Sequence, residues 1–357
     1  MNSSALAKQK YASKFFRKGI TLAILSGVAY GIYVAFVYLA MARGVWEEWY
    51  DETQTFLTIF FVTYVLGALG SAINYTLSAI WAMGFATFRG KIRDLIGSIK
   101  SRPGKTLIIA SLVGGPVSTS AFVIGMQMAG SIVVPITALC PAIGAIIGRA
   151  FYKQKLSKRM LFGIGLCFFA ALLIGLQAIE ADAPPMMLPG ILIASVAAIG
   201  WGFEGAIAGY GTALIDFELG IVIRQLFAGL FGLLILTPLF ALIGGDIGQS
   251  FSLLGQAVTN WDSMQFFLIS SFFCVFAFSL WYKGNAMSGT ALGMACNGVF
   301  AFWGPFFTWV LMGLILGNEG YGMTPILWVS AIIMVIGIWF IAVNPFEFFK
   351  KKRGEMS

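Results

Sequence analysis

Residues 19–35 read GITLAILSGVAYGIYVA, and residues 190–206 read GILIASVAAIGWGFEGA. Both stretches are apolar, open on a glycine and carry an aromatic residue followed by glycine at the same place. Aligning the opening glycines gives three matched pairs: Tyr30 with Trp201, Gly31 with Gly202, and Tyr33 with Glu204. A second match in the same order, between GMQMAGSIV at 125–133 and GNAMSGTAL at 284–292, predicts that the chain consists of two repeats.

The composition predicts an all-α polytopic membrane protein. Of the 357 residues, 59% are hydrophobic and only 11% are charged, against about 25% charged in soluble domains. The apolar residues gather into runs of roughly 20, the length of a helix that crosses a bilayer. We expect ten spans, numbered in chain order: 19–42, 56–84, 106–128, 131–151, 160–179, 188–212, 219–244, 264–286, 288–314 and 325–344.

Five spans fall in each repeat. Because five is odd, the second repeat lies upside down relative to the first, and such inverted repeats are a signature of secondary transporters. The expected organisation is a basic tail at 1–18, a first repeat at 19–179, a second repeat at 188–345 and a basic tail at 346–357.

Basic residues predict the orientation. Twenty of the 23 Lys and Arg residues lie in four segments, at 8–18, 89–105, 149–159 and 350–353. With ten spans these segments all face the same side, and cytoplasmic loops are the ones that collect Lys and Arg. The sequence therefore predicts an inner-membrane protein with both termini cytoplasmic. The net charge of +8 is then a mark of membrane insertion and does not indicate nucleic-acid binding.

Outside the four basic segments, three charged residues lie within the expected spans, where a charge is costly. Glu204 and Arg224 lie roughly 12 and 9 Å from the same membrane face, counted at about 1.5 Å per residue. Two interpretations stay open. The two residues form a structural ion pair, or Glu204 faces the transport path as a cation site or a protonation site. Lys283 lies near the inner end of its span, where its side chain reaches the headgroups or contacts the solute.

The uncharged candidates for binding a solute are mostly aromatic. Tyr30 and Trp201 hold matching positions in the two repeats, and Trp201 shares a helix face with Glu204 three residues later. The remaining candidates are four residues: Tyr33, Gln225, Asn297 and Trp303.

Several motifs resemble a known family. Two five-helix repeats that each open on an aromatic-glycine motif, with YKQKLSKRMLFGIGL from Tyr152, are similar to the drug/metabolite transporter superfamily of the EamA type. The segments AIGWGFEG from Ala198, IRQ from Ile223 and GGPVSTSAF from Gly114 resemble the Lic-type choline permeases of bacteria. That resemblance implies a quaternary ammonium solute held among aromatic rings with one acidic residue. The chain differs in having Tyr30 where a tryptophan is expected, and in its longer, more acidic first outer loop.

The predicted function is secondary active transport of a small, cationic organic solute by alternating access. The alternatives are export of amino acids, drugs or other metabolites, and a lipid-carrier flippase or pore. An enzyme is not expected, because the chain has no histidine and its inner loops offer only Asp94, Asp216 and Glu218. No nucleotide-binding loop, cofactor or metal site is predicted, the four cysteines are expected to be free thiols, and a homodimer is left open.

Overall fold

The computed structural model describes residues 3–51, 56–129, 133–137, 139–153, 157–176, 186–318 and 321–342. These residues form helices and no strand, as expected in lipid, where every backbone polar group needs a partner within the protein. Within these described ranges, seven helices are long and apolar enough to cross a membrane. The chain is therefore a multi-pass, all-helical membrane protein. The C-terminal tail predicted at 346–357 lies outside the described residues.

Helices occupy most of the described residues in each of the ten expected spans. In the first half these are α1 (Ser3–Met41), α3 (Leu66–Phe88) after a π turn (Phe61–Val65), α5 (Arg102–Leu112) joined by a π turn (Val113–Val117) to α6 (Ser118–Ala129), then α7 (Val133–Thr137) with α8 (Cys140–Tyr152), and α9 (Lys158–Leu176). In the second half they are α10 (Met187–Leu214), α11 (Phe217–Phe231) joined by a π turn (Gly232–Leu236) to α12 (Thr237–Ile243), α14 (Trp261–Ser288), then α15 (Thr290–Asn297) with α16 (Phe300–Thr308) and a π turn (Trp309–Ile315), and α17 (Pro325–Ala342).

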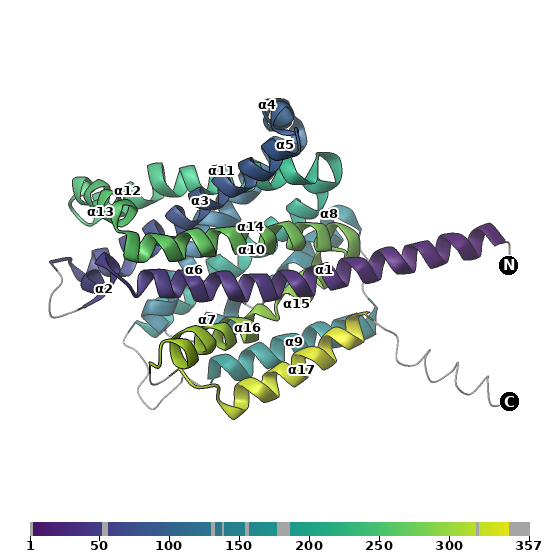
Figure 1. Cartoon of the computed structure of the whole chain (residues 1–357). Coiled ribbons are helices and arrows are strands. Elements are labelled where there is room, and N and C mark those ends of the chain that lie inside the picture. Colours follow the sequence, from purple (N-terminus) through teal and green to yellow (C-terminus); the bar gives the residue numbers. More distant parts are fainter. Residues whose placement is uncertain are drawn as a thin grey trace.

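Short helices connect the spans. They are α2 (Val45–Tyr50), a 3-10 turn (Ile92–Asp94), α4 (Leu95–Lys100) and α13 (Ile247–Thr259). The segment expected as a basic tail at 1–18 is helical from Ser3 and continues into the first span, so that the start of α1 projects beyond the bundle (Figure 1).

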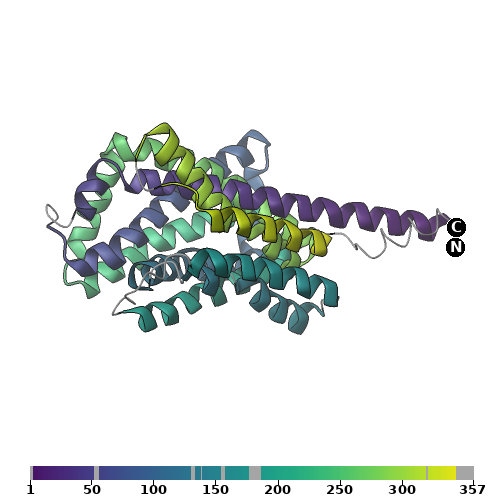
Figure 2. The same ribbon diagram turned by 90° about the horizontal axis from the view of Figure 1, so that it is seen from below.

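The seven candidate membrane helices correspond to spans one, two, three, six, seven, eight and nine. Spans five and ten form α9 and α17, which lie side by side at one edge of the bundle (Figures 1 and 2). Span four is divided into α7 and α8, and span nine into α15 and α16. Pro141 stands in the first turn of α8, where proline's missing N–H leaves no hydrogen bond unmade and favours a new helix start.

Packing between the halves is reciprocal. The first span of each half packs on the third span of the other half, as α1 on α14 and α10 on α6. Each first span also packs on the other half's divided fourth span, α1 on α15 and α16, and α10 on α7 and α8. The second spans pack on each other as α3 on α11, and the fifth spans as α9 on α17.

Matched glycines lie at matched contacts. A side chain at Gly19 would meet Met287 of α14, and one at Gly190 would meet Met128 of α6. The partner glycines repeat the pattern, because Gly284 lies against Ala23 and Gly125 lies against Ala194. Small residues let membrane helices approach closely. The two sequence blocks that match each other are therefore the two places where first and third spans meet.

An ion-pair cluster joins the second spans at one end of the bundle. Lys91, just after α3, lies 2.7 Å from Asp216 and 3.4 Å from Glu218, and Arg89 pairs with Glu218. Asp216 also caps α11, accepting hydrogen bonds from the backbone N–H groups of Glu218 at 2.9 Å and Leu219 at 3.4 Å. Partial burial alone would raise the pKa of the Asp216 carboxyl, but these bonds and the Lys91 ammonium outweigh it and lower that pKa.

A pH series on Asp216→Asn tests this cluster. Because the folded-state pKa lies below the ordinary value, the carboxylate's stabilising contribution is complete above about pH 4 and is lost as the pH falls through the folded-state pKa. We expect the thermal stability of wild type to exceed that of the variant at pH 7 and the difference to close below pH 4. Since exposed ion pairs contribute roughly 0–1 kcal/mol, a difference that is large or independent of pH would contradict this role.

Candidate functional site

A cavity of about 60 Å³ lies where the two halves meet. The first half contributes residues from α1, α7, α8 and α9, and the second half contributes residues from α10, α14, α15 and α16. Six aromatic residues line it: Tyr30, Phe168, Trp201, Phe278, Trp281 and Phe300. Its polar lining consists of Thr137, Asn297 and the thiols Cys140 and Cys167. Within the part of the chain that the structure describes, no charged side chain lines this cavity.

The break in each of the two divided spans lies in the wall of the cavity. Thr137 closes α7 and Cys140 opens α8, while Asn297 closes α15 and Phe300 opens α16, and all four residues line the cavity. Discontinuous helices near the repeat interface are where secondary transporters commonly bind their solutes, because interrupted backbone is tolerated in a membrane only where protein or a cavity surrounds it.

Three of the predicted binding residues line the cavity. Tyr30 and Trp201 contribute one ring from the first span of each half. Asn297 lies at the break in span nine, where its amide N–H donates to the Ser26 hydroxyl at 2.8 Å. Ser26 in turn donates to the Ala277 carbonyl at 2.7 Å. This buried chain of hydrogen bonds ties the break to α1 and α14.

Two predicted binding residues lie beside the cavity and do not line it. Tyr33 packs edge-on against Tyr30, with ring centroids 4.5 Å apart. Trp303 packs against Gly31, whose missing side chain makes room for it, and stacks on Phe307 at 5.5 Å between centroids.

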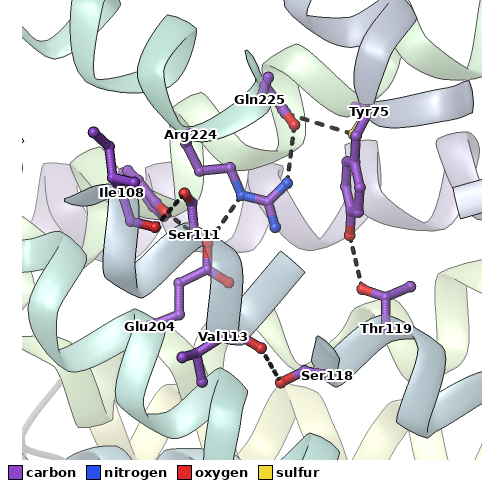
Figure 3. A network of polar contacts seen from close by, with 11 residues as sticks. Tyr75, Ile108, Ser111, Val113, Ser118, Thr119, Glu204, Arg224 and Gln225 are labelled. Carbon is purple, nitrogen blue, oxygen red and sulfur yellow. Dashed lines mark hydrogen bonds and ion pairs between the residues drawn. The ribbon is translucent and has the colours of Figure 1, made fainter. Parts of the chain in front are cut away.

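Glu204 and Arg224 form a fully buried ion pair, with Arg224 Nε 2.9 Å from Glu204 Oε1 (Figure 3). The Tyr282 hydroxyl donates to the same oxygen at 2.6 Å. Arg224 Nη1 also donates to the Gln225 side-chain oxygen at 2.9 Å (Figure 3). Among the described residues, Glu204 Oε2 and Arg224 Nη2 have no hydrogen-bond partner. Gln225, another predicted binding residue, thus accepts a hydrogen bond from this ion pair, and its amide donates to Cys274 Sγ at 3.7 Å.

Aromatic rings enclose the guanidinium. Its central carbon lies 3.5 Å from the ring centroid of Phe278 and 4.5 Å from that of Tyr75. Tyr75 is held by a 2.8 Å hydrogen bond between its hydroxyl and that of Thr119 (Figure 3). Phe278 is the residue that connects the two features, because it lines the cavity and also contacts Arg224.

Gly114, in the π turn before α6, leaves the space that the Glu204 carboxylate occupies. A side-chain carbon at Gly114 would overlap Glu204 Oε2 and approach its Cδ to 2.5 Å. We expect Gly114→Ala to lower the free energy of unfolding by about 1–3 kcal/mol, the usual cost of overpacking a core. Chemical unfolding in detergent measures this change.

Gly84→Ala is the matched control for that substitution. Gly84 lies within α3, and a side chain there would meet nothing within 4 Å. Because alanine is the better helix former, this variant is expected to be as stable as wild type or slightly more stable. Equal losses in the two variants would show that the effect does not come from the Glu204 carboxylate.

Lys283 lies apart from both the cavity and the ion pair. Its side chain is exposed, and its ammonium lies 5.2 Å from the ring centroid of Phe217 at the start of α11. This position is the one expected for a lysine that reaches toward the headgroups from the end of its span.

Sequence reasoning did not single out Phe278, Trp281, Phe168 or Tyr282. Aromatic residues make up 15% of the chain, so residue type alone cannot distinguish these four from aromatic residues that face lipid. The sequence of α14 offered a signal for two of them. Phe278 and Tyr282 are one helical turn apart, so they share a helix face, and they precede the charged residue Lys283. As to metals, no cluster of three or more His, Cys, Asp or Glu ligands occurs within the described ranges.

Comparison with known proteins shows the fold alone. No model of a known protein family matches the chain, and no curated protein matches it. One solved structure, described only as the crystal structure of a protein, is similar at 13% identity and a TM-score of 0.56, over 89% of this chain and 95% of that one.

Proposed function

We propose that the chain is a secondary active transporter of the drug/metabolite transporter superfamily. It moves a small organic cation, such as choline or another quaternary amine, across the bacterial inner membrane by alternating access. The observation that carries this proposal is the aromatic cavity. Both halves of the chain line it, and the breaks in spans four and nine lie in its wall.

The reciprocal packing supports two five-helix repeats, 19–179 and 188–345, and the odd number of spans in each inverts the second. The clustering of Lys and Arg in four segments supports cytoplasmic termini. The contacts of first with third spans and of first with fourth spans each occur again with the halves exchanged, and the second spans and the fifth spans pack on each other. The same glycines that match in sequence take matching places in these contacts. In a pseudo-twofold arrangement of this kind, each repeat can adopt the conformation of the other. Exchange of the two conformations would open the cavity first to one side of the membrane and then to the other.

The lining supports a cationic solute. Six aromatic residues surround a small space, and ring faces attract an onium group by about 2 kcal/mol when water is excluded. A quaternary amine has no N–H group to satisfy, so it suits a wall with few hydrogen-bond acceptors. Tyr30, Trp201 and Asn297 are the predicted binding residues that would contact it, together with Phe278 and Trp281.

The lining of the cavity favours a solute carrier over a lipid-carrier flippase. The headgroup site of such a flippase would be cationic, and neither Arg224 nor Lys283 lines the cavity.

Uptake into proteoliposomes tests the proposal. With a potential of 100 mV, negative inside, one positive charge gains about 2.3 kcal/mol, so labelled choline should accumulate nearly fifty-fold over protein-free vesicles before the potential decays. Dissipating the potential should abolish the excess. Uptake of neutral or anionic amino acids in place of choline would contradict the cationic solute, and chemical alteration of the solute would indicate an enzyme.

A further inference from the structure

The cavity and the buried ion pair share one wall. Phe278 lines the cavity, and the Arg224 guanidinium carbon lies 3.5 Å from its ring centroid. Glu204 contacts Arg224 and Tyr282 and does not line the cavity. One formal positive and one formal negative charge therefore lie directly behind an aromatic residue that would contact the solute.

We propose that the Glu204–Arg224 pair sets the charge preference of the cavity from behind Phe278, without contacting the solute. The pair is a positioning element, in which Glu204 neutralises an arginine that would otherwise repel a cation. This inference rests on the proposed function and deepens it, because it assigns the selectivity for cations to the balance of a buried pair.

The other groups packed on the pair are uncharged. Glu204 accepts a hydrogen bond from Tyr282, and Arg224 contacts Gln225, Tyr75 and Phe278. Lys283, the nearest lysine along α14, is exposed and directed at Phe217. The net charge behind Phe278 is thus zero with both members of the pair ionised, and +1 when only Arg224 is charged.

The expected size of the effect follows from Coulomb's law. A cation on the cavity side of the Phe278 ring would lie about 8 Å from the guanidinium, where one uncompensated charge at an effective dielectric constant of about 20 weakens its binding by about thirty-fold. A neutral solute of the same shape would not sense that charge. The ratio of the two affinities therefore reports charge balance, and a general structural defect would weaken both.

The test measures binding of choline and of 3,3-dimethylbutan-1-ol, its neutral carbon isostere, to purified full-length protein. Glu204→Gln should weaken choline binding by about thirty-fold and leave the neutral isostere unchanged. The double variant Glu204→Gln/Arg224→Met has no unpaired charge, and it should restore the wild-type ratio of the two affinities to within about three-fold.

The double variant separates the two possible roles of Glu204, because it buries no unpaired charge. Loss of choline preference in Glu204→Gln together with its recovery in the double variant supports the proposal. Selective loss of choline binding in the double variant shows that Glu204 contacts the cation directly and overturns it. Wild-type protein that binds neither solute overturns the proposed function, and this inference with it.

Discussion

Replacing Arg224 with methionine is expected to lower the free energy of unfolding by about 3–5 kcal/mol, the cost of leaving the other member of a buried ion pair without its partner. Both side chains are fully buried. Glu204 would keep only the hydrogen bond from Tyr282 in a medium that cannot hydrate its charge. Equilibrium unfolding in a mild detergent measures the loss.

Lys283→Met is the matched control for this prediction, since it removes a basic residue that lies within another of the expected spans. Its exposed ammonium contacts the Phe217 ring, and an exposed contact of this type contributes about 0.5–1 kcal/mol. A similar loss of unfolding free energy in both variants would show that the loss does not come from leaving a buried charge unpaired. The double variant Glu204→Gln/Arg224→Met should recover most of the stability lost in Arg224→Met, because it contains no unpaired buried charge.

Replacing Trp201 with leucine is expected to weaken choline binding by about thirty-fold, since a desolvated cation–π contact contributes about 2 kcal/mol and each 1.4 kcal/mol is about tenfold. Trp201 is 9% exposed, lines the cavity and packs on Phe122. Calorimetry or a thermal-shift titration with choline measures the change. Leucine keeps an apolar wall, so binding of 3,3-dimethylbutan-1-ol should fall much less.

Trp339→Leu is the control for Trp201→Leu. Trp339 lies on α17 with 46% of its surface exposed, and it does not line the cavity. Its replacement should leave choline affinity unchanged. If choline bound equally well to wild type and to Trp201→Leu, the cavity would not be the cation site.

Part of the site could be predicted from the sequence. Glu204 and Arg224 stand out because charge is rare in apolar runs, and counting residues from the ends of their helices places them at similar depth. That estimate agrees with the 2.9 Å contact between their side chains. The match of Tyr30 with Trp201 also identified two residues that line one cavity. The inverted-repeat architecture and the choline-like solute stay predictions.

The remaining lining residues could not be predicted in this way. In a soluble helix the alternation of polar and apolar residues shows which face is buried. In a membrane the lipid-facing and buried faces are both apolar, so the sequence does not show how each helix is rotated. Phe278 and Trp281 therefore resemble Phe276, which lies on the same helix with 40% of its surface exposed.

The sequence by itself determined that the chain is a helical membrane protein, the positions of its apolar spans and the presence of Glu204 and Arg224 within them. These follow from local composition, because hydrocarbon imposes a length on helices and a large cost on unpaired charge. Only the tertiary structure decided that Glu204 faces Arg224 and Tyr282 while the cavity is left to aromatic rings. That choice depends on how the helices are rotated, on where spans four and nine are divided, and on the space that Gly114 leaves for a carboxylate. The rotation of the helices and the fit at Gly114 arise from packing between distant segments.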